Sequence, residues 1–167
     1  STHMSKTDTN LMDAFAGESQ ANRKYLAYAK QAEKDGLPQA AKLFRAAAEA
    51  ETIHAHAHLR LAGKIGNTLD NLKDAIAGET HEFTAMYPGM IKDAEAEGKK
   101  AVVQYFKFVN EVEEVHANLY KKMLENQGKG ADVDYYICSV CGYTHEGPHD
   151  DKCPVCNAGA SAFYKAE

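Results

Sequence analysis

The chain has 167 residues, of which 44% are hydrophobic and none is Trp, so it can hold one ordinary helical domain and a small appendage. Its formal net charge of -5 argues against a nucleic-acid partner, because phosphate binding needs clustered Lys and Arg, and here these residues are scattered. No apolar run reaches the roughly 18 residues that a membrane span needs and no apolar leader is present, so we expect a soluble, cytoplasmic protein.

The chain is expected to contain four parts of unequal size. They are an expression-tag remnant at 1–3, a helical domain at 4–126, a linker at 127–133 and a small second domain at 134–167. The linker is rich in Gly and polar residues, and beyond it Tyr135, Tyr136 and Ile137 predict a short β segment. A domain of about 35 residues is too small for a sizeable core without a staple, and a bound metal would serve.

Breaks in a stretch rich in Ala, Leu, Glu and Lys divide the first domain into four predicted helices. We expect them at 8–34, 38–63, 69–97 and 99–126. Pro38 fits the first turn of the second helix, whereas Pro88 lies inside the third helix and should kink or locally distort it. Four helices in sequence predict an all-α bundle.

Each predicted helix carries acidic residues on the stripe that faces the core. In the first helix the residues of this stripe, from Leu11 and Phe15 to Ala29, recur every three or four positions, so they lie on one face. The other helices repeat this spacing. The polar residues at the centres of the four stripes are Glu18, Glu51, His54, Glu79, Glu82, Glu113 and His116. Five carboxylates in a helical core would each incur a large desolvation cost and would repel one another, so a positive charge must lie among them.

One Glu from each of two helices and a Glu-x-x-His pair from each of the other two form the ligand pattern of ferritin-like di-iron bundles. Carboxylates with a few imidazoles suit iron or manganese, whereas a lone zinc prefers fewer ligands in a tetrahedron. An error of register would explain one such Glu, but four helices agree. His56 and His81 fall off the stripes and are expected at the surface. His58 lies one turn beyond His54, and we interpret it as a residue that packs beside the ligands rather than as a ligand.

All four cysteines lie in the small second domain, in two Cys-x-x-Cys pairs. The pairs are Cys138 with Cys141 and Cys153 with Cys156. Such pairs form knuckles whose backbone N–H groups stabilise the thiolates, and four thiolates in a tetrahedron take iron or zinc. The spacing leaves both metals open. A redox-active carboxylate site on the same chain would need an electron donor, which favours iron. Tyr135, Tyr136, Tyr143, Phe163 and Tyr164 are expected to form an aromatic core around this site.

These motifs resemble the rubrerythrin family over nearly the whole chain. The segments that carry the resemblance are Ala14-Phe-Ala-Gly-Glu-Ser-Gln-Ala21, Glu51-Thr-Ile-His54, Gly78-Glu-Thr-His-Glu-Phe-Thr-Ala-Met-Tyr-Pro88, Glu113-Glu-Val-His116 and the two cysteine knuckles. The resemblance implies a four-helix ferritin-like bundle followed by a rubredoxin-like metal-bound β domain. Asn157 departs from the Gly that is common after the second knuckle, but Asn tolerates a left-handed backbone, so metal binding should survive.

The resemblance also implies a role for each candidate ligand. Glu18 and Glu79 would be terminal ligands, and Glu51 and Glu113 would bridge two irons. His116 would bind one iron, while His54 and Glu82 would exchange at the other as its oxidation state changes. Tyr25 and Tyr87 would hydrogen-bond ligand carboxylates, although simple packing also explains both tyrosines. Each chain would then hold two irons in the bundle and one iron between the cysteines.

The expected function is hydrogen peroxide reduction by a non-haem di-iron peroxidase in oxidative-stress defence. The cysteine-bound iron would relay electrons from a separate NAD(P)H-dependent rubredoxin reductase, because this sequence has no Gly-rich dinucleotide fingerprint after a strand. Two alternatives remain open at this stage. An iron-storage protein or ferroxidase would use the same bundle without needing the cysteines or Glu82, and a non-redox module would carry zinc.

The short connection between the second and third helices predicts a homodimer, with helices exchanged between subunits as its simplest form. In a ferritin-like bundle these two helices run parallel, so the connection must return over about 33 Å to bring Glu51 and Glu79 to one site. The few residues from Gly63 to Thr68 reach only about 20 Å when extended. Helix ends misplaced by several residues would also remove the conflict.

Overall fold

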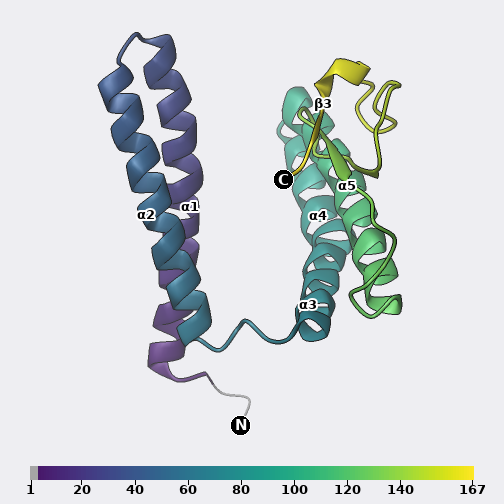
Figure 1. Cartoon of the computed structure of the whole chain (residues 1–167). Coiled ribbons are helices and arrows are strands. Elements are labelled where there is room, and N and C mark those ends of the chain that lie inside the picture. The colour runs from purple at the N-terminus through teal and green to yellow at the C-terminus, as the bar shows by residue number, and fades with distance from the viewer. Residues whose placement is uncertain (1–3) are drawn as a thin grey trace. The chain divides into compact units, whose positions relative to one another are not determined.

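The computed structural model describes residues 4–167 (Figure 1), so the interpretation of 1–3 as a tag remnant lies outside the described residues. Contacts divide the chain into a first unit that ends at Gly66 and a second unit that spans Asn67–Glu167. The helices are α1 (Lys6–Lys34), α2 (Pro38–Leu61), α3 (Thr68–His81), a π-helix η1 (Glu82–Met86), α4 (Tyr87–Ala96) and α5 (Lys100–Glu125). The remaining elements are the strands β1 (Tyr135–Cys138), β2 (Thr144–Glu146) and β3 (Phe163–Lys165), with a 3-10 turn η2 at Ala160–Ala162.

The first unit is a hairpin of α1 and α2, which run side by side (Figure 1). Helix α1 begins two residues before its expected start, because the Ser5 side chain accepts a hydrogen bond from the Asp8 backbone N–H and the Asp8 carboxylate accepts one from the Ser5 backbone N–H. The turn relies on Gly36, whose φ of +72° suits glycine. Small buried residues, including Ala29 and Ala41, let the two helices approach closely.

One buried polar side chain ties the two helices together near the acidic residues. Asn22 of α1 is only 8% exposed. Its Nδ2 donates to the Ala48 carbonyl oxygen at 2.7 Å and to Thr52 Oγ1 at 2.8 Å, both on α2. A buried amide that finds two acceptors on the neighbouring helix fixes the relative register of α1 and α2.

The segments α3, η1 and α4 follow one another without a break, and they replace the single predicted helix at 69–97. The expected distortion at Pro88 is confirmed, and it takes the form of a π-helical turn just before the proline. Pro88 has no N–H and its ring excludes a normally placed carbonyl one turn earlier. In the π-turn, the Tyr87 N–H donates instead to the carbonyl of Glu82, five residues back. π-turns inside helices are frequent at functional sites, and this one begins at Glu82.

The second unit continues with α5 and a three-stranded antiparallel sheet of order β2-β1-β3. Its buried core joins Val112 of α5 to Cys138, Cys141 and Cys153. The predicted β segment at Tyr135 is thus confirmed as β1. The order of elements, four helical segments followed by a small β domain, is as expected from the sequence.

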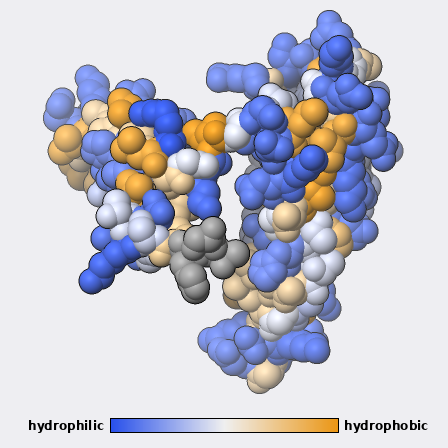
Figure 2. All heavy atoms as spheres, turned by 90° about the horizontal axis from the view of Figure 1, so that it is seen from below, coloured by the Kyte–Doolittle hydropathy of each residue, from blue (hydrophilic) through white to orange (hydrophobic). Residues whose placement is uncertain are grey.

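Apolar side chains remain exposed on the helices of both units. Leu43, Ile53 and Leu61 of α2 are 69–70% exposed, and Val102 of α5 is 42% exposed. Figure 2 shows such hydrophobic side chains at the surface, in orange. Large exposed apolar side chains, when they gather on one face, are characteristic of surfaces that associate. Among residues 4–167, no helix has both the length and the apolar character needed to cross a bilayer.

Candidate metal centres

The first unit brings together three of the predicted ligands. Glu18 of α1 faces Glu51 and His54 of α2, and one ligand atom from each lies within 4.8 Å of the other two. The Nδ1 atom of His54 is 3.2 Å from Glu18 Oε1 and 3.8 Å from Glu51 Oε2. Two carboxylates and an imidazole that converge in this way form a group suited to a divalent cation.

A second imidazole lies against Glu18. His58 Nε2 contacts the Oε2 atom of Glu18, although the two groups are not aligned as a hydrogen bond and that buried oxygen has no hydrogen-bond partner among the described residues. Both oxygens of Glu18 therefore face an imidazole, His54 on one side and His58 on the other. His56 is exposed, as expected.

His58 is expected to hold the Glu18 carboxylate in place. In His58→Gln the affinity of the group formed by Glu18, Glu51 and His54 for ferrous ion should fall by about 10–100-fold. This is the effect usual for residues that orient a metal ligand. Competition titration against a ferrous chelator measures it. His56→Gln is the matched control, because it makes the same substitution half a turn away on the exposed face, and it should leave the affinity unchanged. Equal affinities in the two variants would contradict this role.

The second unit brings together a second group of three ligands. Glu79 of α3 meets Glu113 and His116 of α5, again with ligand atoms within 4.8 Å of one another. His116 Nδ1 is 3.6 Å from Glu79 Oε1 and 3.5 Å from Glu113 Oε1. These distances are too long for hydrogen bonds. They suit atoms that flank an ion with bonds of about 2.1 Å. A buried oxygen of Glu79 also has no hydrogen-bond partner among the described residues.

Glu82 extends this second group from the π-turn. A hydrogen bond with Glu113, together with burial, raises the pKa of Glu82 from its ordinary value to about 7. Burial also raises the pKa of both Glu79 and Glu113. Without a cation the group therefore holds a proton near neutral pH. A metal must displace that proton, so metal affinity should rise as pH increases through 7.

Two tyrosines lie close to the second group. Burial, followed by the charges of Glu113 and Glu82, raises the pKa of Tyr87, so its hydroxyl stays protonated and able to donate. Burial and the charges of Glu79 and Glu113 do the same to Tyr120. Tyr120 is not among the site residues predicted from the sequence, although its position one turn after His116 was a usable signal.

In the first unit, Tyr25 packs against aromatic side chains. Its ring lies 6.2 Å from that of Phe44 and 6.4 Å from that of Tyr28. These contacts agree with simple packing, one of the two roles that the sequence left open for Tyr25. A hydrogen bond from Tyr25 to a ligand carboxylate stays a prediction.

The four cysteines form a compact group of sulfur atoms. Cys138 Sγ is 3.7 Å from Cys156 Sγ, and Cys141 Sγ is 3.6 Å from Cys153 Sγ. Disulfides have S–S distances near 2.05 Å, so these are free thiols. A tetrahedron with metal–sulfur bonds of about 2.3 Å has edges of roughly 3.8 Å, which is close to both distances. The group thus fits a single tetrahedral metal, iron or zinc.

The two knuckles have the same backbone geometry. Gly142 and Asn157 follow the second cysteine of each knuckle with φ of +84° and +64°, and their N–H groups donate to the carbonyls of Cys138 and Cys153. Asn157 therefore adopts the left-handed conformation expected of it. Burial opposes ionisation of Cys138, but the backbone N–H groups of Cys141 and Val140 bring its pKa below the usual value. The backbone thus stabilises a thiolate at Cys138, whereas burial outweighs the backbone N–H groups and raises the pKa of Cys141 and Cys156.

The aromatic core around the cysteines differs from the expected one. Tyr143 and Phe163 pack against the cysteine cluster, but Tyr164 is 54% exposed. His149 stacks on Phe163 instead, with ring centroids 4.3 Å apart. Neighbouring residues of a strand point to opposite faces, so β3 can turn only one of its two aromatic residues inward.

Comparisons with known proteins show the family of the chain. The family model Rubrerythrin matches residues 9–124, and a model for the rubredoxin-like domain of rubrerythrin matches 136–164. Rubrerythrin-2 of Clostridium acetobutylicum is 32% identical to this chain, and the match covers 92% of each chain. Nigerythrin of Nitratidesulfovibrio vulgaris is 34% identical, and the match covers 93% of this chain and 84% of nigerythrin. A solved structure of fully reduced, all-ferrous nigerythrin aligns with a TM-score of 0.58 at 32% identity, covering 99% of this chain and 89% of the other. The chain belongs to the rubrerythrin family.

Proposed function

We propose that this protein reduces hydrogen peroxide to water at a di-iron carboxylate site and that a cysteine-bound iron relays the electrons. The reaction takes up two electrons and two protons and yields two water molecules. The residues that would hold the bundle irons are Glu18, Glu51, His54, Glu79, Glu82, Glu113 and His116, and those that would hold the third iron are Cys138, Cys141, Cys153 and Cys156. The functional domains would be 4–126 and 134–167, joined by the linker 127–133, and the family models match 9–124 and 136–164.

The observation that carries the proposal is the packing of the cysteine group against α5. Val112 shares a buried cluster with three cysteines, and Glu113 and His116 follow it on the same helix. The cysteines that would hold the electron-relaying iron and the carboxylates that would hold the bundle iron are thus parts of one unit. An iron-storage protein would not need this arrangement.

The protein's own residues would orient the reaction in three ways. Iron bound here would supply the electrons that break the O–O bond. Glu82 in its π-turn, together with His54, would let the ligand set follow a change of metal charge, as the family resemblance implies. Tyr87, which stays protonated beside Glu82 and Glu113, would donate a hydrogen bond to a ligand carboxylate. In the metal-free chain Glu82 and Glu113 share a proton, and a metal bound by these carboxylates would displace it.

The electrons would come from a separate reductase, such as an NAD(P)H-dependent rubredoxin reductase. Free thiols at all four cysteines agree with a reducing compartment and therefore with a cytoplasmic location.

We further propose that the active form is a homodimer with exchanged helices. A complete site needs the three ligands of the first unit and the four of the second. In ferritin-like bundles the helices that correspond to α2 and α3 run parallel. The connection between them must then return along the bundle over the length from Glu51 to the end of α2 plus the length from the start of α3 to Glu79. Together these lengths are about 32 Å. Lys64 N donates to the Leu59 carbonyl oxygen, so the chain folds back as α2 ends. The remaining residues to Thr68 span only about 17 Å. The first unit of one subunit would therefore complete the site with the second unit of its partner.

A visible absorption spectrum during anaerobic reduction, followed by one equivalent of peroxide, tests the activity. A red thiolate-to-iron band should bleach on reduction and return rapidly with peroxide, and the metal content should be three irons per chain. A colourless protein with zinc in the cysteine site would contradict the electron relay. A band that peroxide fails to restore, or the accumulation of many irons per chain, would favour the storage alternative.

A further inference from the structure

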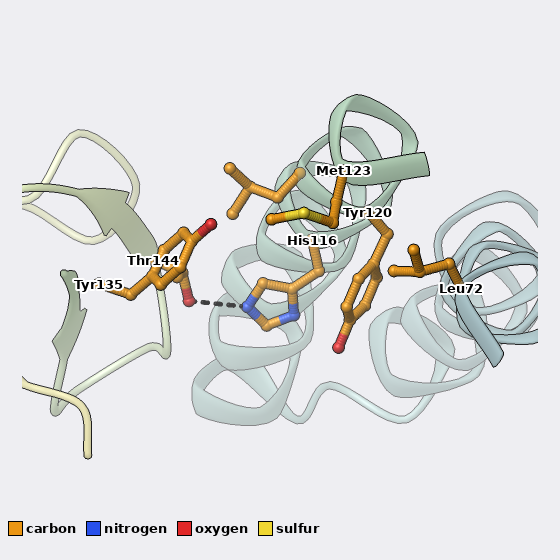
Figure 3. Close-up of a pocket in the computed structure, with 7 residues that line it drawn as sticks. Leu72, His116, Tyr120, Met123, Tyr135 and Thr144 are labelled. Atoms are coloured by element: carbon orange, nitrogen blue, oxygen red, sulfur yellow. Dashed lines mark hydrogen bonds between the residues drawn. The ribbon is translucent and has the colours of Figure 1, made fainter. Parts of the chain in front are cut away.

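The two ring nitrogens of His116 face different parts of the second unit. Nδ1 faces Glu79 and Glu113, at 3.6 and 3.5 Å. Nε2 points the other way, toward the β domain, where it lies 2.9 Å from the hydroxyl oxygen of Thr144 (Figure 3). Both residues line a cavity of about 330 Å³ between α3, α5 and the first two strands. The imidazole thus connects the carboxylate group to the domain that carries the cysteines.

The hydroxyl group of Thr144 has one proton, and a backbone carbonyl lies within reach to accept it. Thr144 Oγ1 donates to the carbonyl oxygen of Gly142 at 3.1 Å. A carbonyl can only accept, so the hydroxyl has no second proton to give to His116. With the hydroxyl proton directed to Gly142, Nε2 of His116 carries the proton of the neutral imidazole and donates a hydrogen bond to Thr144. The Gly142 backbone also favours a protonated ring, because its hydrogen bond with His116 raises the pKa of the imidazole against the larger effect of burial. The lone pair of Nδ1 is left free on the side of the carboxylates.

The acceptor is held rigidly by the cysteine loop. Gly142 directly follows Cys141, and its N–H donates to the Cys138 carbonyl oxygen at 2.8 Å. Thr144 begins β2 and pairs with Ile137 of β1. On the helix side, Val112 lies one turn before His116 and packs among the cysteines. The same docking contact that buries Val112 therefore sets the position of the hydroxyl opposite Nε2.

We propose that Thr144 is a positioning residue that fixes the tautomer of His116, so that Nδ1 is presented to a metal held with Glu79 and Glu113. The inference rests on the proposed carboxylate metal site but not on peroxide turnover. Hydrogen bonds to the second ring nitrogen of a metal-bound histidine orient the ring and raise its basicity. Here that bond comes from the loop of the other metal centre, so folding of the cysteine loop prepares the carboxylate site.

The first test measures the tautomer directly. The full-length protein is stripped of metal and given one equivalent of Zn²⁺, which the four thiolates take first. Long-range ¹⁵N–¹H correlation spectra then show which nitrogen of His116 carries the proton, with His116→Gln used to assign the signals. We expect the Nε2–H form in the wild type and in Thr144→Ser, and a new Nδ1–H population in Thr144→Val. An unchanged tautomer in Thr144→Val would overturn the proposal.

The second test separates positioning from packing. Thr144→Val keeps the shape of the side chain but loses the hydroxyl, whereas Thr144→Ser keeps the hydroxyl but loses the methyl group. Affinity of the carboxylate site for ferrous ion should fall by about 10–100-fold in Thr144→Val and recover in Thr144→Ser. The reverse order would show that Thr144 acts by packing alone and would overturn the proposal. If the wild type proved inactive toward peroxide, the proposed function would fail, while both of these measurements would still decide the role of Thr144.

Discussion

Glu51→Ala and Glu113→Ala chains, each inactive alone, are expected to recover about one quarter of the wild-type peroxide turnover when they are unfolded together and refolded as a mixture. Glu51 belongs to the first unit and Glu113 to the second, and each lies in a separate ligand group. In a dimer with exchanged helices, each site combines the first unit of one chain with the second unit of the other. A mixed dimer then contains one intact site and one that lacks both carboxylates. About half of the dimers are mixed, so about a quarter of all sites are intact.

A mixture of Glu18→Ala with Glu51→Ala is the matched control. Both substitutions lie in the first unit, so every site in every dimer keeps one defect and no activity should return. Bound iron, measured after gel filtration, should follow the same pattern as turnover. If the first mixture forms dimers yet stays as inactive as the control, each site is built within one chain, and the exchange of helices is excluded.

The helix ends were predictable to within about two residues because backbone chemistry marks them. Gly36, Gly63 and Gly98 all adopt positive φ just beyond a helix, and each follows a run of helix-forming residues. The start of α1 was placed too late, since the capping pair of Ser5 and Asp8 was not recognised. Pro88 predicted a distortion but not its type. Tertiary packing determines whether a proline causes a kink or a π-turn in a helix, and this packing cannot be read from the sequence.

The ligand groups could be predicted because helical periodicity alone determines which carboxylates share a face. Glu79, Glu113 and His116 meet in the structure although the first two lie 34 positions apart in the sequence. The role of Thr144 could not be predicted in this way. Its contact with His116 depends on how the β domain docks on α5, and a lone threonine at a strand start carries no signal of that contact.

Cys153→Ser is expected to abolish the visible thiolate-to-iron band and to reduce reductase-linked peroxide turnover by about 100-fold or more, while the bundle keeps its iron. Cys153 is 2% exposed and its sulfur lies 3.6 Å from that of Cys141. A serine hydroxyl at this position ionises far less readily and is a harder ligand, so the four-sulfur site is lost. A single turnover, with bundle iron reduced chemically beforehand, should still consume peroxide. Lys152→Ser places the same residue at the adjacent exposed position and should retain both the band and full turnover.

Mixing experiments with Cys153→Ser would also show which bundle site each cysteine iron serves. If the relay runs within one unit, where the cysteines pack on α5, then Cys153→Ser and Glu51→Ala should complement each other in a mixed dimer. One of the two sites would then have both its own cysteine iron and a complete ligand set. Cys153→Ser mixed with Glu113→Ala should not recover, because both defects lie in second units and every site keeps one of them. Recovery in the second mixture would mean that electrons cross from the cysteine iron of one second unit to the carboxylate site of the other, and the relay through α5 would be contradicted.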